Sequence, residues 1–374
     1  MRNSRWLFVP VVLAGCACPA PAVAGYIYAV IDPAGSNVLE VDVNGLNASG
    51  QATGSYLDLN LTSHGFVRDA GGSITTFDGA PGASSTLATA INNIGEVAGD
   101  YHDAGNHIHG FLRDPGGLLT TFDVPGSHRT VIDALNNSGA SAGIYADANN
   151  VFHGFIRQAD GTVTTVDVPG ATRTQVNSLN ASGVATGAYA DASGTFHGFL
   201  RAANGTITLF DSPGSLNTPA LLNNAGLVAG TYNVGGFPYS GYLRDASGTI
   251  VSFDVPGATS TIINALNNAG AVGGQADDFG FLRSPDGSIA ELTVPGGIGT
   301  SVTALNDSGQ AAGSYTDSDG RNLGFIATLS AVPEPNSIVL LASSVLAGLA
   351  FHLGRRRRAT DSASRNRPLT SLMG

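Results

Sequence analysis

The sequence predicts an all-β domain built from repeated, four-stranded antiparallel units. Three observations lead to this prediction. A Gly-aromatic pair recurs in seven copies, 39 to 45 residues apart, and most copies read like HGFLRDPGGLLTTFDVPG (residues 109–126). A second segment of the type LNNSGASAGIY alternates with it, also in seven copies. Glycine ends the tight turns within both segments, as expected where the last turn residue has a positive φ.

Each unit divides into four short strands, a to d. Strand a is the β-branched run that ends in Leu-Asn, as in residues 130–136, and strand b follows its glycine turn, as in residues 140–145. Strand c is the His-Gly-Phe-Leu-Arg run, and strand d is the Thr-x-Phe-Asp run. No stretch of the repeat region shows a sustained 3.6-residue apolar period, so we expect no helix there. Four antiparallel strands in about 44 residues are typical of a β-propeller blade, whereas the rival β-solenoid has shorter rungs.

The two ends of the repeat region predict how the ring closes. The last copy stops after strand c, while the first segment, GYIYAVIDPAG, matches only strand d. We therefore expect residues 25–331 to form a seven-bladed propeller in which Tyr28–Ile31 pairs with Gly324–Thr328. Such closure pairs the backbone N–H and C=O groups that an open ring would leave exposed at its edges.

The amino-terminal segment predicts export. Two arginines precede the apolar run Trp6–Leu13, and a small-x-small site ends at Ala24, so residues 1–24 are an expected signal peptide. As an alternative, Leu-Ala-Gly-Cys is similar to a bacterial lipobox and would place a lipid on Cys16. Both cysteines of the chain lie in this segment, so we expect no disulfide in the exported domain.

The carboxyl-terminal segment has three parts. A short motif (Pro333, Glu334, Pro335) precedes an uncharged run, residues 337–353, that we expect to form a transmembrane helix, and four arginines follow it (Arg355, Arg356, Arg357, Arg358). Residues 332–358 together resemble the PEP-CTERM sorting signal of exopolysaccharide-producing Gram-negative bacteria. The resemblance implies recognition by an exosortase-like membrane protease, a membrane-anchored precursor, and release to the cell surface or biofilm matrix.

The chain departs from that family because it continues through residues 359–374, an expected cytoplasmic tail. An ordinary carboxyl-terminal membrane anchor is the alternative interpretation.

The repeats are similar to bacterial extracellular HAF repeats, although glycine stands in the middle of His-Gly-Phe. This resemblance implies an extracellular location and a repeat architecture, and it transfers no reaction. Residues 25–331 carry nine arginines, no lysine and 26 acidic residues, which is a formal net charge of −17. Such a charge disfavours nucleic acid as a partner and favours cations.

Side chains that recur with the repeat have both a functional and a structural interpretation. The histidines of strand c are His64, His109, His153 and His197, the arginines that end strand c are Arg68, Arg113, Arg157, Arg201, Arg244 and Arg283, and the aspartates that end strand d are Asp78, Asp123, Asp167, Asp211 and Asp254. Rings of such groups would suit a metal, a polyanion or a sugar. Equivalent positions of neighbouring blades lie on the order of 10 Å apart, however, which is too far for one metal ion. We therefore expect the histidines to hydrogen-bond within their own blade, and the arginines and aspartates to form ion pairs and turn caps.

The largest departure from the repeat is the loop 232–239. Its aromatic residues Tyr232, Phe237 and Tyr239 are candidate contacts for sugar rings. The loop 317–320 is similar to the start of a calcium loop without its bidentate glutamate, so Ca²⁺ is the one cofactor that stays open.

No nucleophile elbow, HExxH zinc motif or phosphate loop is present in the sequence. We therefore predict an exported, non-enzymatic cell-surface or biofilm-matrix protein that binds exopolysaccharide or other surface components. A secreted propeller enzyme, either a polysaccharide lyase or a glycosidase, is the alternative.

Overall fold

The computed structural model describes residues 25–214, 216–217 and 221–330. Ile27–Thr328 forms one compact unit, which holds the repeats. The described residues contain strands and a single 3₁₀ turn, η1 (Gly35–Asn37), and none of them belongs to a helix able to cross a bilayer. The all-β prediction is therefore confirmed for this part of the chain. The expected signal peptide, sorting signal and tail (1–24 and 332–374) lie outside it.

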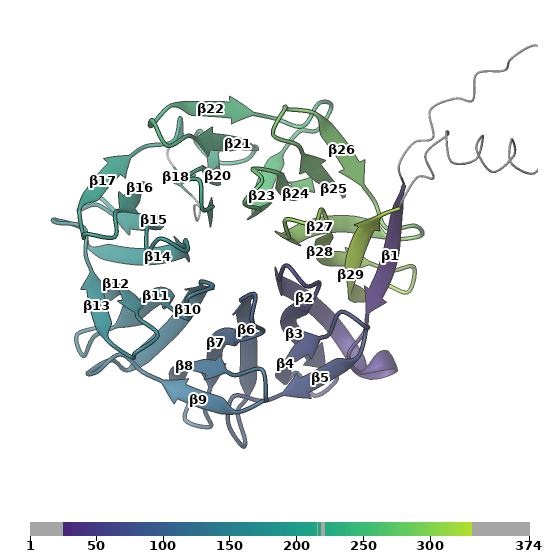
Figure 1. The fold of residues 1–374 in the computed structure, drawn as a ribbon, viewed down its shortest axis with the longest axis horizontal. Helices are drawn as coiled ribbons and strands as arrows, with labels where there is room; N and C mark the ends of the chain where they lie inside the picture. Colours follow the sequence, from purple (N-terminus) through teal and green to yellow (C-terminus); the bar gives the residue numbers. More distant parts are fainter. Residues whose placement is uncertain (1–24, 215, 218–220, 331–374) are drawn as a thin grey trace, which may run out of the picture. The chain divides into compact units, whose positions relative to one another are not determined.

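The repeats fold into antiparallel groups of four strands around a ring (Figure 1). The innermost strands are β2 (Val38–Leu46), β6 (Ser85–Ile91), β10 (Arg129–Leu135), β14 (Arg173–Leu179), the pair β18 (Leu216–Asn217) and β19 (Leu221–Leu222), β23 (Thr261–Leu266) and β27 (Ile298–Leu305). The second strands are β3 (Ala52–Asp58), β7 (Val97–His102), β11 (Ser141–Ala146), β15 (Ala185–Ala190), β20 (Val228–Asn233), β24 (Val272–Ala276) and β28 (Ala311–Thr316).

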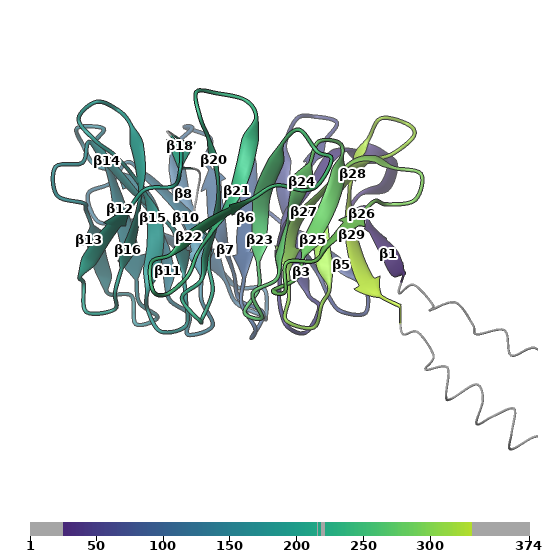
Figure 2. The same ribbon diagram turned by 90° about the horizontal axis from the view of Figure 1, so that it is seen from above.

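The two outer positions of each group complete the ring. The third strands are β4 (Ser63–Arg68), β8 (Ile108–Arg113), β12 (Phe152–Arg157), β16 (Phe196–Arg201), β21 (Tyr239–Arg244), β25 (Phe279–Arg283) and β29 (Asn322–Leu329). The rim strands are β5 (Ile74–Phe77), β9 (Leu119–Phe122), β13 (Val163–Val166), β17 (Ile207–Phe210), β22 (Ile250–Phe253), β26 (Ile289–Leu292) and β1 (Tyr26–Ile31). The strands run between two faces that carry the turns (Figure 2). One face, here called the Asn face, carries the turns that follow the first and third strands of each group.

The aromatic residue of each Gly-aromatic pair fills the core between groups. Phe66, Phe111, Phe155, Phe199, Tyr242, Phe281 and Phe325 are all completely buried. Phe111 of β8 packs with Ala88 and Val97 of its own group and meets Phe77 of the preceding group edge-on, at 5.7 Å between ring centroids. Burial of one phenylalanine contributes about 1.5–3 kcal/mol, so the most regular motif of the sequence supplies the packing between neighbouring groups.

A bulge interrupts each complete innermost strand at the same point. In β10 the register with β11 shifts between Ile132 and Ala134, which leaves Asp133 as the extra residue. The bulge brings the carbonyl of Val131 so close to Gly143 of β11 that a Cβ there would clash with it. A bulge also re-aims the extra side chain, here toward the centre of the ring.

The expected closure of the ring is confirmed. β1 pairs with β29, and the Ser330 amide donates to the Gly25 carbonyl at 2.8 Å. Ile31 is completely buried, and Tyr28 meets Phe325 edge-on at 6.0 Å between ring centroids. The first strand of the domain therefore completes the group that begins with β27.

Candidate functional site

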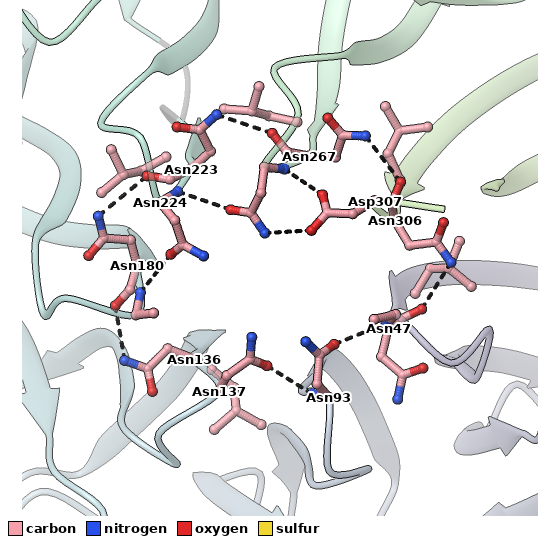
Figure 3. A pocket seen from close by; sticks show the side chains of 18 of the residues that line it. Asn47, Asn93, Asn136, Asn137, Asn180, Asn223, Asn224, Asn267, Asn306 and Asp307 are labelled. Carbon is pink, nitrogen blue, oxygen red and sulfur yellow. Dashed lines mark hydrogen bonds between the residues drawn. The ribbon is translucent and has the colours of Figure 1, made fainter. Parts of the chain in front are cut away.

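A closed ring of asparagines surrounds the centre of the Asn face. The first asparagine of each Leu-Asn turn donates from Nδ2 to the carbonyl of its counterpart in the next group. The donors and their distances are Asn47 (3.0 Å), Asn92 (3.3 Å), Asn136 (3.0 Å), Asn180 (3.3 Å), Asn223 (3.2 Å), Asn267 (3.1 Å) and Asn306 (3.0 Å). The last bond, from Asn306 to Asn47, joins residues at opposite ends of the domain (Figure 3).

The same side chains also shape their turns. The Oδ1 atom of Asn136 accepts the backbone amides of Ser138 at 2.9 Å and Ala140 at 3.0 Å. An asparagine at this position thus caps the turn with its oxygen and links the groups with its nitrogen. All seven residues are buried, which makes this first layer structural.

A second layer of polar side chains is formed by the residues that directly follow the buried asparagines in the sequence, and its polar members are exposed on the Asn face. It consists of Asn93, Asn137, Asn224, Asn268 and Asp307, with Ala48 and Ala181 at the two remaining positions. The Oδ1 atoms accept the backbone amide of the preceding group, as Asn137 does from Asn93 at 2.9 Å. Asn268 also donates from Nδ2 to the Asp307 carboxylate at 3.0 Å. The Nδ2 groups of Asn93, Asn137 and Asn224 have no partner among the described residues.

These second-layer residues line a pocket of about 250 Å³, here called the ring pocket. Figure 3 shows their side chains converging on it from different groups. The wall of the ring pocket therefore presents amide N–H donors without a protein partner together with one carboxylate, that of Asp307. Such an arrangement suits a neutral ligand that is rich in hydroxyl groups, because amides both donate to and accept from hydroxyls.

A second pocket of about 280 Å³, here called the bulge pocket, adjoins the ring pocket. The two share six apolar lining residues, namely Leu46, Ile91, Leu135, Leu179, Leu266 and Leu305. It is lined by the bulge residues Asn44, Thr89, Asp133, Asn177, Asn264 and Thr303. Most of these donate to the next group, as Asn44 does to the Ala88 carbonyl at 3.0 Å and Thr89 to the Ile132 carbonyl at 2.7 Å. Asp133, which is ionisable, instead accepts Gln175 Nε2 at 3.0 Å. Burial raises the pKa of Asp133 to about 7, with the same direction and value for neighbouring Asp100.

The four strand-c histidines hydrogen-bond within their own blades, as predicted. His197 Nδ1 lies 2.6 Å from Asp211 at the end of strand d, and its Nε2 lies 3.4 Å from Asp191 of the turn before strand c. Tyr189 stacks on the ring at 5.1 Å. The hydrogen bond to Asp211 raises the pKa of His197 against the opposing effect of burial. His64, His109 and His153 repeat this arrangement.

The expected ion pairs between the strand-c arginines and the strand-d aspartates are wrong. Strands c and d are antiparallel, so the end of one lies at the opposite face from the end of the other, and the aspartate meets the histidine instead. The arginines cap the following turn, as Arg113 does on the Asp114 carbonyl at 3.4 Å. Four of them also stack on a phenylalanine of the preceding group: Arg113 on Phe77, Arg157 on Phe122, Arg244 on Phe210 and Arg283 on Phe253, at 4.8–5.2 Å.

The predicted glycan loop does not present its three aromatic residues together. Phe237 is 70% exposed, and Tyr239 meets it edge-on at 6.2 Å between ring centroids. Tyr232, in contrast, packs against the core cluster around Val228 and Tyr242. Two of the three candidates therefore remain available at the surface.

The predicted calcium loop commits its first carboxylate to protein partners. Asp317 accepts the amides of Asp319 and Arg321 and forms an ion pair with the Arg321 guanidinium at 2.7 Å. The backbone hydrogen bond from Arg321 lowers the pKa of Asp317 despite some desolvation. The described residues hold no cluster of three metal-ligating side chains. Ala24 and the sorting residues Pro333, Glu334, Pro335 and Arg355–Arg358 lie outside them.

The asparagines are the residues that sequence reasoning missed. Their signal was present, because a Leu-Asn pair, or Ile-Asn in the second copy, recurs in every copy and is followed by asparagine, aspartate or alanine. The sequence alone assigns these turns only to hairpin geometry, since nothing local indicates that turns about 44 residues apart meet around one pocket.

No protein-family model and no curated protein sequence matches the chain. Similar solved structures include a puromycin hydrolase (TM-score 0.50, 12% identity, 74% of this chain and 50% of that one) and TolB from Acinetobacter baumannii (TM-score 0.44, 15% identity, 75% and 64%). A further similar structure is YCF48 bound to D1 peptide (TM-score 0.46, 10% identity, 82% and 97%). The chain thus spans half of the hydrolase and less than two thirds of TolB.

These similar proteins are β-propellers. At such low identity the likeness shows the fold alone. The chain is therefore a β-propeller assembled from sequence repeats, and its function has to be inferred from its own side chains.

Proposed function

We propose that this chain is an exported, non-enzymatic protein of the cell surface or biofilm matrix that binds exopolysaccharide with a seven-bladed propeller. One observation carries the binding proposal, namely the convergence of unpartnered amide groups on the ring pocket. A neutral, hydroxyl-rich glycan segment would receive hydrogen bonds from Asn93, Asn137 and Asn224 and donate one to Asp307. The export and sorting proposals rest on the two ends of the sequence.

The test replaces the three second-layer asparagines together, as Asn93→Ala/Asn137→Ala/Asn224→Ala. The chain itself carries alanine at two equivalent positions, Ala48 and Ala181, so the fold should tolerate the change. A neutral glycan bound by the wild type on a glycan array should lose at least ten-fold in affinity, while the melting temperature stays within a few degrees.

A second variant, Phe237→Ala/Tyr239→Ala, tests the loop as the competing site. We expect it to bind like the wild type. Unchanged binding by the asparagine variant together with lost binding by the loop variant would move the site to the loop.

The alternative of a polysaccharide-active enzyme has one observation in its favour. Asp133 lies in the wall of the bulge pocket, and a carboxyl group with a pKa of about 7 is suited to general acid catalysis at neutral pH. Release of reducing ends from the bound glycan by wild type, and its loss in Asp133→Asn, would establish this alternative and overturn the non-enzymatic proposal.

A further inference from the structure

Two clefts on the Asn face repeat the same architecture one unit apart. The first cleft lies between the groups that begin with β6 and β10, and the second between those that begin with β10 and β14. Their volumes are about 360 and 370 Å³, within the range of about 300–1,000 Å³ typical of small-ligand sites. Most lining residues of one cleft correspond to residues 44 positions further along the chain in the other, such as Arg157 and Arg201.

The two clefts differ in charge: two arginines, Arg113 and Arg157, and two acidic residues line the first, so its formal charge is zero, whereas the second has a formal charge of +1. Glu96 and Asp114 line the first cleft, whereas Ala140 and Gln158 stand at the equivalent positions of the second. Arg201 is the only charged residue that lines the second cleft, in a domain whose formal net charge is −17. The nearby Asp160 belongs to the same turn as Gln158 but does not line the cleft, and its carboxylate accepts the Thr162 amide at 2.9 Å.

The Arg201 guanidinium in the second cleft also makes fewer contacts with the protein than the Arg157 guanidinium in the first. Arg157 in the first cleft lies over the Phe122 ring at 5.2 Å, and its Nε is buried. Val166 replaces that ring beside Arg201, which makes one hydrogen bond, from Nη1 to the Ala202 carbonyl at 3.5 Å. The Nε and Nη2 edge of Arg201 is therefore left to pair with a planar carboxylate, the geometry a guanidinium matches with two parallel bonds.

The remaining lining suits a sugar ring. Gln158, Ser138, Thr164 and Ser182 supply amide and hydroxyl groups, while Ile156, Leu179 and Ala140 supply apolar surface for C–H groups. We propose that the second cleft binds a carboxylate-bearing sugar residue of the uronic acid type, with Arg201 on the carboxylate. The second cleft adjoins the ring pocket, since Asn136, Leu179 and Ala181 line both, but Arg201 lines only the cleft. The inference rests on Arg201 and therefore stands whether or not the ring pocket binds a neutral glycan.

The experiment measures calorimetric binding of oligogalacturonate to the full-length purified protein, with its methyl ester as the uncharged ligand of the same backbone. Salt at 0.15 M limits the reach of the domain's negative field to about 8 Å, and EDTA removes divalent cations that would bridge acidic groups. We expect binding of oligogalacturonate in EDTA and a loss of at least ten-fold for the ester. No binding by the wild type, or equal binding of both ligands, overturns the proposal.

Three variants locate the site. Arg201→Gln should lose about 10- to 100-fold in affinity, as expected when charge-assisted hydrogen bonds are removed. Its fold is expected to persist because Ala327 occupies the equivalent position in β29. Ala140→Glu/Gln158→Asp, which copies the acidic groups of the first cleft, should lose a similar factor. Arg157→Gln is the matched control and should stay within about two-fold of wild type. Wild-type affinity in Arg201→Gln, or an equal loss in Arg157→Gln, overturns the assignment.

Discussion

Replacing Asn136 with alanine tests whether the buried asparagine ring holds the propeller together. The substitution removes three hydrogen bonds, two accepted from turn amides and one donated to the Asn180 carbonyl. It also leaves the amide of Ala140, a residue only 5% exposed, without its side-chain partner. A net loss of about 1 kcal/mol per bond predicts that unfolding becomes easier by roughly 3 kcal/mol. At about 2 °C per kcal/mol for a domain of this size, the melting temperature should fall by about 6 °C.

The neighbouring residue provides the control. Asn137 is exposed and accepts a single amide, from Asn93, so water can replace its side chain. Asn137→Ala should therefore lower the melting temperature by less than about 2 °C. Thermal unfolding followed by circular dichroism compares the two variants directly. Equal shifts for both would refute the claim that the buried layer stabilises the ring and the exposed layer does not.

Two further predictions concern pH and sorting. Because the folded-state pKa of Asp133 is raised to about 7, the contribution of this residue to stability should be greatest at low pH and fall as the pH rises from about 4 to about 7. Compared with the wild type, Asp133→Asn should therefore gain melting temperature progressively over this pH range, and asparagine stands at the equivalent position 44. A difference between the two proteins that does not change with pH would contradict the burial of a carboxyl group there. Replacing Pro333, Glu334 and Pro335 by alanine should leave full-length protein in the membrane fraction; processing at the wild-type rate on immunoblots would mean that the segment serves only as an anchor.

Much of the fold could be predicted from local sequence. The strands, their order and their turns follow from apolar alternation and from glycines that recur at the same place in every copy. Closure by β1 followed from counting strands, because the first segment matches the strand that the last copy lacks. The histidine contacts also followed, since His197 and Asp211 face each other across one hairpin.

The partners of the strand-c arginines could not be predicted from the local sequence. Their proximity to aspartates in the sequence suggested ion pairs, yet the antiparallel hairpin carries the two groups to opposite faces. The side chain that each arginine packs against comes from the preceding group. It is Phe122 for Arg157, and Val166 stands at the equivalent position for Arg201.

The sequence by itself thus determined the repeated unit, because each strand and turn is specified within about 44 residues. Only the tertiary structure decided which side chains share a pocket. The bond from Asn306 to Asn47 spans nearly the whole domain, and it exists because ring closure brings the first and last groups together. A turn asparagine that looks structural in one copy becomes part of a polar pocket only when all copies point to the same centre.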